Sequence, residues 1–146
     1  MTYAMSRAER EQFLALAHMG VVSVVENGMP LTVPMWYAYE PGGAVTLITG
    51  KDSRKTGGVR EAGWLSLCAQ DPAWPYKYVT AAGPAAISRQ ANHAEQRVMA
   101  ERYLGAQGAD SYMAWITDSG EADEQVVIEM TPRAWLSVDY GKPGEA

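Results

Sequence analysis

Hydrophobic and polar residues alternate over several short stretches of the chain, which is the pattern of β-strands that bury one face. In the clearest stretch, Leu65, Leu67 and Ala69 fall on one face and the residues between them on the other. Other stretches are rich in β-branched and aromatic residues and are separated by Gly, Pro and Asn. We therefore predict strands over residues 21–26, 29–39, 44–49, 64–70, 76–88, 125–131 and 134–138.

Turn residues refine this pattern. Asn27-Gly28, between the first two predicted strands, is the strongest short signal for a β-hairpin, because both residues tolerate a positive φ. Pro30 and Pro34 lack the N–H of a regular ladder and predict an edge strand or a bulge in the second strand. Gly83-Pro84 predicts a break or a bulge in the fifth strand.

Three segments begin with a residue that caps helix N-termini, namely Ser6, Ser53 and Asn92. The first also carries Glu9 three residues later, which completes a capping-box pattern. We predict helices from Ser6 to Gly20, from Ser53 to Ala62 with Gly63 as the stop, and from Asn92 to about Leu104. Residues 105–124 give no clear pattern beyond a helical turn at 112–116.

Six or seven strands with helices at three points indicate a mainly β protein, a small antiparallel β-barrel with peripheral helices. The 146 residues fit one domain with a proper core, so we predict a single domain over 1–146. Residues 1–8 and 141–146 are expected to fray, since the tail is rich in Gly, Pro and Glu.

Charge and composition exclude several classes of function. The net charge is −5 with no basic stripe, so nucleic acid is not an expected partner. The apolar stretches are too short for a transmembrane helix, and the first five residues lack the features of a signal peptide. The single cysteine, Cys68, leaves no internal disulfide and no cysteine-based metal site, and we interpret it as a small buried residue. We expect a cytoplasmic protein that does not bind membranes.

The sequence offers no catalytic motif. It contains no P-loop, GxSxG, HExxH or GxGxxG in the required setting. His18 and His93 lie far apart in the chain with no nucleophile to pair with, and we assign neither a catalytic role. We therefore name no catalytic residue and no metal ligand.

A cationic loop lies between the third predicted strand and the helix at 53–62. Ser53, Arg54 and Lys55 combine a hydroxyl, two cations and the free N–H groups of a helix start, which together favour a phosphate. The alternative is an ordinary solvated turn. The sequence alone leaves both interpretations open.

The strand at 29–39 offers apolar and aromatic surface for a flat ring. Met35, Trp36 and Tyr37 are able to flank such a ring, and Pro34 frees polar backbone from the ladder. The alternative is that Trp36 fills the barrel. A second aromatic segment, 74–78, is able to wall a pocket or to bury a dimer contact. A planar cofactor that carries a phosphate is the hypothesis that joins the strand and the loop.

Short motifs follow one another along the chain in a characteristic order. They are Asn27-Gly28-x-Pro30, Pro34-Met-Trp-Tyr-Ala38, Thr49-x-x-x-Ser53-Arg-Lys55, Trp64-Leu-Ser-Leu67, Tyr76-Lys-Tyr-Val79, Gly83-Pro-Ala85, Arg102-Tyr-Leu-Gly105 and Val127-Ile-Glu-Met-Thr-Pro132 with Trp135. Their order and spacing resemble the pyridoxamine 5′-phosphate oxidase-like split-barrel proteins, in the short branch of flavin- and deazaflavin-dependent oxidoreductases. The resemblance covers about residues 10–140.

The resemblance implies a six-stranded antiparallel split barrel that forms a homodimer, with a groove for FMN or coenzyme F420 at each subunit interface. In the family, one loop holds the phosphate, one strand lies along the ring, and aromatic residues of the partner chain close the groove. The corresponding residues are Thr49, Ser53, Arg54 and Lys55 for the loop, Val33, Pro34, Met35 and Trp36 for the strand, and Trp74, Tyr76 and Tyr78 for the aromatic wall.

Two departures from the family pattern bear on function. Where members often have Arg-Asn-Leu-Arg-Arg after the lysine, this chain has Thr56-Gly-Gly-Val-Arg60, which argues against a site for a polyanionic tail. The chain also lacks the C-terminal substrate segment of true pyridoxamine phosphate oxidases, so vitamin B6 oxidation is not expected. The resemblance implies an oxidoreductase that transfers hydride to or from a small, apolar or conjugated substrate. The alternatives are a non-catalytic flavin, deazaflavin or haem carrier, and a barrel that serves only dimerisation.

Overall fold

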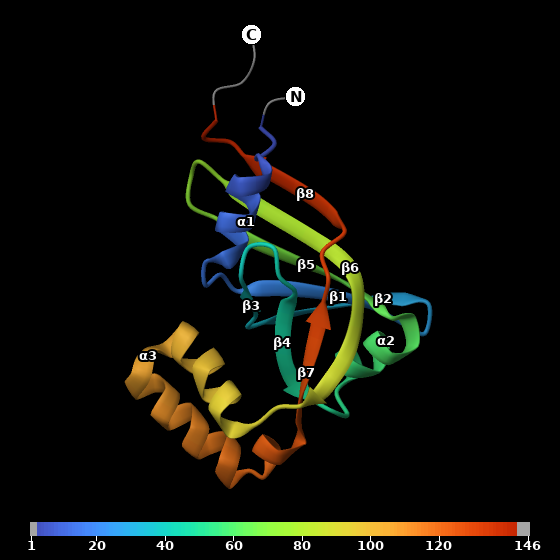
Figure 1. Ribbon diagram of the computed structural model, residues 1–146, viewed down its shortest axis with the longest axis vertical. Helices are drawn as coiled ribbons and strands as arrows, with labels where there is room; N and C mark the ends of the chain where they lie inside the picture. The colour runs from blue at the N-terminus through green and yellow to red at the C-terminus, as the bar shows by residue number, and fades with distance from the viewer. Residues whose placement is uncertain (1–2, 143–146) are drawn as a thin grey trace.

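The computed structural model describes residues 3–142 and places them in an eight-stranded antiparallel sheet with three α-helices and one short 3₁₀ helix. Helix α3 stands apart from the sheet on the side of β4 (Figure 1). The elements in chain order are α1 (Arg7–Ala15), β1 (Gly20–Glu26), β2 (Met29–Met35), β3 (Ala38–Tyr39), β4 (Val45–Gly50), α2 (Arg54–Ala62), β5 (Trp64–Asp71), β6 (Lys77–Gln90), α3 (His93–Asp118), η1 (Glu121–Glu124), β7 (Gln125–Met130) and β8 (Ala134–Asp139).

Strand β6 links the two halves of the sheet. Its first part, residues 77–82, pairs with both β5 and β8, and its second part, residues 85–90, pairs with β7. The strand order is β2-β1-β5-β6-β7-β4-β3, with β8 beside the first part of β6. In Figure 1, β6 curves around the other strands, so the sheet wraps around a core without closing, as expected of a split barrel.

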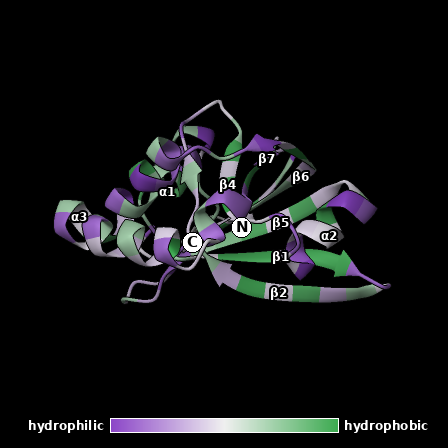
Figure 2. Cartoon of the chain, turned by 90° about the horizontal axis from the view of Figure 1, so that it is seen from below, coloured by the Kyte–Doolittle hydropathy of each residue, from purple (hydrophilic) through white to green (hydrophobic). Residues whose placement is uncertain are grey.

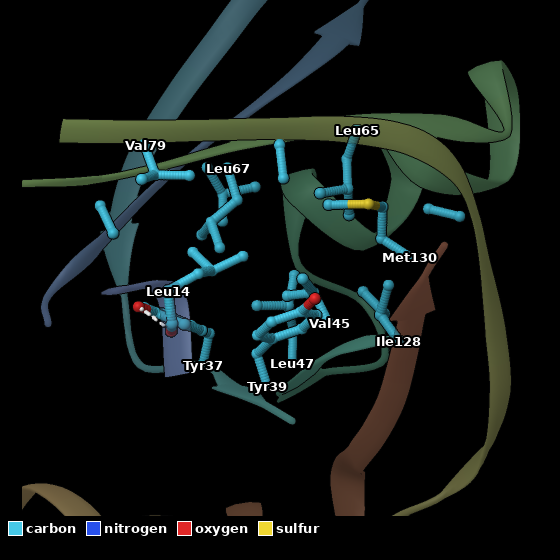
Figure 3. Packing of buried hydrophobic residues seen from close by; sticks show 14 of the residues in the cluster. Leu14, Tyr37, Tyr39, Val45, Leu47, Leu65, Leu67, Val79, Ile128 and Met130 are labelled. Carbon is cyan, nitrogen blue, oxygen red and sulfur yellow. Dashed lines mark hydrogen bonds between the residues drawn. The ribbon is translucent and has the colours of Figure 1, made fainter. Parts of the chain in front are cut away.

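The hydrophobic core lies inside this curved sheet. β5 follows the predicted alternation, since Leu65, Leu67 and Ala69 are all buried, and Figure 2 shows hydrophobic residues along β1 and β5. Side chains from both halves of the sheet and from α1 meet in one cluster (Figure 3), whose burial is the main contribution to stability. The residues labelled there are Leu14, Tyr37, Tyr39, Val45, Leu47, Leu65, Leu67, Val79, Ile128 and Met130.

The strand predicted over 29–39 is in fact two strands, β2 and β3, separated by a two-residue break. Tyr37 leaves the sheet because α3 satisfies its backbone: its N–H donates to the Tyr103 hydroxyl at 3.1 Å. Its carbonyl accepts from Arg102 Nε at 2.9 Å, and its own hydroxyl donates to the Leu14 carbonyl at 2.7 Å. The described chain therefore has eight strands rather than the six or seven that were predicted.

Tyr37→Phe is expected to lower the free energy of unfolding by about 1–3 kcal/mol, because the Leu14 carbonyl would lose a donor inside the core. Tyr37 is fully buried, so water cannot replace its hydroxyl. Urea denaturation followed by tryptophan fluorescence measures the loss. Tyr39→Phe is the matched control, since that hydroxyl accepts one 3.3 Å hydrogen bond from Gly42 at a turn. Equal losses in the two variants would contradict this role of Tyr37.

Strand β6 runs without a bulge at Gly83-Pro84, where the sequence predicted one. Both residues pair in register with β5, and the shift in register lies further along, between Ile87 and Arg89. The glycine meets a different need, because a Cβ atom at position 83 would lie 1.8 Å from the carbonyl oxygen of Thr131. The chain segment between β7 and β8 passes directly over this glycine.

Capping signals located the helix starts but not the end of α1. Capping boxes begin α1 and α3, and α2 is capped and ends at Gly63 as predicted. Helix α1 ends at Ala15 and not at Gly20. The guanidinium of Arg102 donates to the carbonyls of Ala15 and Leu16 at 3.0 and 2.9 Å, and so satisfies this helix end from outside the helix.

Helix α3 is much longer than predicted. It passes the expected end at Leu104 and continues to Asp118, with Gly105 in a non-helical conformation at φ 74°. This glycine divides α3 into two arms that lie side by side in Figure 1. An ion pair of 2.7 Å between Arg97 and Asp110 joins the arms.

Contacts hold both ends of the described chain. The Met5 N–H donates to Ser137 Oγ at 3.0 Å, and the Lys142 ammonium lies 2.6 Å from the Glu9 carboxylate. Of the two segments expected to fray, residues 1–2 and 143–146 lie outside the described residues. Across residues 3–142, no helix combines the length and the apolarity that crossing a bilayer requires.

Candidate functional site

A cleft of about 930 Å³ lies between the sheet and α3. The end of β2, the loop from β4 to α2, both arms of α3 and the start of β7 form its walls. Its volume is within the range of pockets that bind small molecules and cofactors. The lining residues are Met19, Pro34, Met35, Trp36, Ile48, Thr49, Gly50, Lys51, Asp52, Ser53, Lys55, Gln96, Met99, Tyr112, Trp115, Ile116, Glu121, Glu124 and Gln125.

Lys55 supplies an uncompensated cation to this cleft. Its side chain is half-buried, and burial lowers its pKa with no carboxylate to offset the effect within residues 3–142. The neighbouring cations are paired: Lys51 lies 2.9 Å from the Glu124 carboxylate. Arg54 Nε donates to both carboxylate oxygens of Glu26. Among the residues that the structure describes, an anion that enters the cleft therefore finds one free positive charge.

Hydroxyl groups organise the start of α2 beside this cation. Ser53 Oγ accepts from the Thr56 N–H at 3.3 Å and lies 2.9 Å from Thr56 Oγ1. Thr56 Oγ1 in turn donates to the Gly50 carbonyl at 2.7 Å. Arg54 and Lys55 open the helix, so their backbone N–H groups lack intrahelical acceptors. This part of the cleft therefore offers N–H donors, a cation and the positive end of a helix dipole.

Trp36 provides an aromatic wall at the end of β2. Its indole stacks on Tyr103 of the first α3 arm, with ring centroids 5.3 Å apart and planes 8° apart. It also meets Tyr112 of the second arm at 5.1 Å. Trp36 therefore does not fill the barrel, and Tyr37 occupies the core instead.

The second arm of α3 adds a wall that the sequence analysis did not assign. Tyr112, Trp115 and Ile116 line the cleft, and Trp115 is 60% exposed. Their spacing of three and four residues places them on one helix face, which is the signal that marks this arm. The helical turn predicted at 112–116 was correct, but nothing local indicated that this face would meet β2.

Gln96, on the first arm of α3, borders the cleft with an incompletely bonded amide. Its side chain is 3% exposed, and Nε2 donates to the carbonyls of Ala122 at 2.8 Å and Ala91 at 3.3 Å. Its Oε1 is buried and has no donor within residues 3–142. Sequence reasoning missed this residue, because one glutamine on a helix carries no local signal.

Most of the predicted cofactor residues meet in the cleft, and five lie elsewhere. Val33 packs against the core, and Arg54 turns away toward β1. Trp74, Tyr76 and Tyr78 lie around the loop before β6, where Trp74 is 80% exposed. These three were assigned to a partner chain, so their place in one chain does not test that assignment. The predicted residues that the cleft brings together are Pro34, Met35, Trp36, Thr49, Ser53 and Lys55.

Neither histidine borders the cleft. His18 stacks on Phe13 with centroids 4.3 Å apart, and burial lowers its pKa, while His93 lies 3.1 Å from Asp123 at the start of α3. Cys68, predicted to be buried, is partly exposed on the outer face of β5. Among residues 3–142, no three potential metal ligands of the His, Cys, Asp or Glu type come together.

A protein-family model described as pyridoxamine 5′-phosphate oxidase matches residues 6–139, which is nearly the whole chain. No curated protein matches the chain in sequence.

Several solved structures share this fold. A conserved hypothetical protein from Mycobacterium tuberculosis superposes with a TM-score of 0.75 at 24% identity, over 100% of this chain and 94% of that one. An F420 reductase gives 0.71 at 20% identity, over 86% and 94% of the two chains. A FAD-binding protein from Mesorhizobium loti gives 0.65 at 18% identity, over 92% and 94%. At these identities the likeness shows the fold alone.

Proposed function

The chain belongs to the pyridoxamine 5′-phosphate oxidase family, and we propose that it is an oxidoreductase that uses FMN or coenzyme F420 to transfer hydride to or from a small substrate. The observation that carries this proposal is Lys55. Burial of an ammonium that no carboxylate within residues 3–142 offsets is unfavourable, and a phosphate would supply the opposite charge. The likeness to an F420 reductase and to a FAD-binding protein agrees with this class of ligand.

Each wall of the cleft suits one part of such a cofactor. Lys55 and the N–H groups at the start of α2 would hold the phosphate, with Ser53 and Thr49 beside them. Pro34, Met35 and Trp36 would lie along the ring. Once bound, the ring supplies the hydride chemistry. The residues of the cleft would then orient the ring and exclude water.

The remaining walls favour an apolar or conjugated substrate. Met99, Tyr112, Trp115 and Ile116 present apolar and aromatic side chains from α3. Aromatic faces bind conjugated rings through offset stacking as well as through burial of area. We propose that the substrate binds against this wall.

Carboxylates at the cleft bear on the choice of cofactor. Asp52, Glu121 and Glu124 line the cleft, and Lys51 pairs with only one of them. An oligoglutamate tail, as F420 carries, would be repelled by the others, whereas FMN ends in its single phosphate. We therefore expect FMN to bind more tightly than long-tailed F420 at low salt.

We also propose that the chain forms a homodimer through the outer face of β1, β5, β6 and β8. On these strands, the side chains that point away from the core carry no charge over the paired residues, which is typical of interface centres. Residues that pair between neighbouring strands form two rows across this face. One row is Val21, Cys68, Thr80 and Leu136, and the row beside it is Ser23, Ser66, Ala82 and Ala134.

This face connects the cleft to the aromatic segment. Pro34, which lines the cleft, pairs with Val21 at one edge of the face, and Tyr78 pairs with Val138 near the other. A two-fold axis that lies in the interface plane and runs parallel to these edges would bring the opposite edges of the face together. Trp74, Tyr76 and Tyr78 of the partner subunit would then close the cleft, as the family pattern implies.

Light scattering tests the dimer. We expect twice the mass of one chain, and a monomeric wild type would contradict the proposal. Thr80→Arg places a charge at the centre of the face and is expected to give a monomer. Val98→Arg is the matched control, because Val98 is 68% exposed on α3, away from this face.

Absorbance and mass spectrometry of the ligand released from purified protein test the cofactor, followed by titration with FMN and F420. We expect a yellow chromophore or micromolar affinity for one of the two. A protein with neither property is not a flavin-type oxidoreductase.

Turnover separates an enzyme from a carrier. Tight binding without turnover across a panel of reductants and acceptors would favour a carrier on the same barrel. For haem, the described walls offer no histidine or cysteine, and the side chains there of types that ligate haem iron are Met19, Met35, Met99 and Tyr112. If the barrel serves only dimerisation, Lys55→Ala leaves every ligand interaction unchanged.

A further inference from the structure

The neighbours of Gln96 determine how its amide is oriented. Nε2 faces two backbone carbonyls, those of Ala122 and Ala91, and carbonyl oxygens only accept hydrogen bonds. Turning the amide over would place Oε1 against both of them. The oxygen is therefore the atom left without a partner among the described residues, and a buried acceptor without a donor costs free energy.

Gln96 lies between the cationic part of the cleft and the wall at Trp36. On one side, Ala122 belongs to η1, whose Glu124 pairs with Lys51 at 2.9 Å in the loop before α2. On the other side, Tyr103, which stacks on Trp36, is seven residues further along the same helical arm. That spacing corresponds to about 10 Å along a helix.

We propose that Gln96 Oε1 accepts a hydrogen bond from a hydroxyl of the polyol chain that joins the ring to the phosphate in the bound cofactor. The inference rests on the proposed function. The phosphate and the ring carbonyls only accept, so they leave Oε1 unsatisfied. The donors of the cofactor are the ring N–H and the several O–H groups of the polyol. The polyol is favoured because Gln96 lies between the cationic part of the cleft and the wall at Trp36.

Gln96→Met tests this assignment with three ligands that share one ring: FMN, riboflavin without the phosphate, and lumiflavin without the polyol. Fluorescence titration is expected to show about tenfold weaker binding of FMN and riboflavin, and unchanged binding of lumiflavin. A general disturbance of the fold would weaken all three equally, so the comparison isolates the hydroxyl contact. If the wild type binds only the deazaflavin ring, the three ligands to compare are the deazaflavin with polyol and phosphate, with the polyol alone, and with neither.

Gln90→Met is the matched control. Gln90 Nε2 donates to the carbonyl of Asp123 at 2.9 Å, but its side chain is exposed and does not line the cleft. This variant is expected to bind all three ligands as the wild type does. If Gln96→Met loses lumiflavin as strongly as FMN, or loses neither, the assignment of Gln96 to the polyol is overturned.

A measurement on the wild type covers the case in which Gln96→Met does not fold. The ¹³C resonance of the Gln96 side-chain carbonyl is expected to move when riboflavin is added, and to stay in place with lumiflavin. The reverse result overturns the assignment. A wild type that binds no member of either series overturns the proposed function, whereas a wild type and a Gln96→Met variant that bind FMN equally overturn only the role of Gln96.

Discussion

Lys55→Met is expected to weaken the binding of FMN by between about tenfold and a hundredfold and to leave riboflavin, which has no phosphate, unaffected. The reason is that no carboxylate within residues 3–142 compensates Lys55, while Lys51 and Arg54 already have carboxylate partners. Fluorescence titration of both ligands measures the difference. Arg7→Met is the control, since it removes one positive charge from α1, outside this cleft and outside segment 74–78. An equal loss for riboflavin would contradict a phosphate contact.

The same variant is expected to be at least as stable as the wild type without ligand. Burial lowers the pKa of Lys55 in the folded protein, so the unfolded chain binds this proton more tightly. The charged lysine therefore destabilises the fold at neutral pH, and this penalty shrinks as the pH rises from the lowered pKa toward the ordinary pKa of lysine. Thermal denaturation of the two apo proteins tests this. A clear fall in melting temperature would show that Lys55 supports the fold instead of a ligand.

The affinity for FMN is expected to fall as the pH rises through the lowered pKa of Lys55, because the ammonium then loses the charge that binds the phosphate. Titrations above about pH 7, where the phosphate is already a dianion, isolate the lysine. Lys55→Arg keeps its charge across this range and should show no such fall. Riboflavin provides the second control, and a pH dependence shared by both ligands would contradict the assignment.

Gly83→Ala is expected to lower the free energy of unfolding by about 3 kcal/mol or more, at the upper end of overpacking effects. A Cβ atom there would lie 1.8 Å from the Thr131 carbonyl oxygen. The segment between β7 and β8 cannot easily retreat, because backbone hydrogen bonds hold it on both sides of the glycine. The Thr131 N–H donates to the Pro84 carbonyl at 2.9 Å, and the Arg133 N–H donates to the Ala82 carbonyl at 2.8 Å.

Gly57→Ala is the matched control for this substitution. Gly57 is exposed in α2, and a Cβ atom there has no neighbour within 4 Å. The change is expected to raise the free energy of unfolding by about 0.5–1 kcal/mol through helix propensity. Urea denaturation of both variants gives the comparison. If Gly83→Ala remained within about 0.5 kcal/mol of the wild type, the close approach over β6 would be wrong.

Features set by residues close in the sequence were predictable. The alternation at Leu65, Leu67 and Ala69, the hairpin at Asn27-Gly28 and the helix between Ser53 and Gly63 all depend on interactions over a few residues, and all three were confirmed. The loop that ends in Lys55 was likewise located from the strand before it and the cap at its start.

Other features depend on partners that are distant in the chain. The hydrogen bond between Tyr37 and Tyr103 spans 66 residues, yet it is part of what divides the predicted strand at 29–39. Arg54 looked equivalent to Lys55 in the sequence. In the structure Glu26 neutralises Arg54, whereas no carboxylate within the described chain neutralises Lys55. Gln96 gained its free oxygen only because two carbonyls, at Ala91 and Ala122, converge on its nitrogen.

The sequence by itself thus determined most of the strands, the helix starts and the family pattern around the loop before α2, because capping, turn geometry and alternation act locally. The tertiary structure alone decided which cation stays free, that the second arm of α3 walls the cleft, and which acceptor remains unsatisfied. These properties arise where charges and polar groups from separate elements are buried together. The free energy of each buried group depends on which partner it finds, and that partner is too distant in the sequence for a local pattern to reveal it.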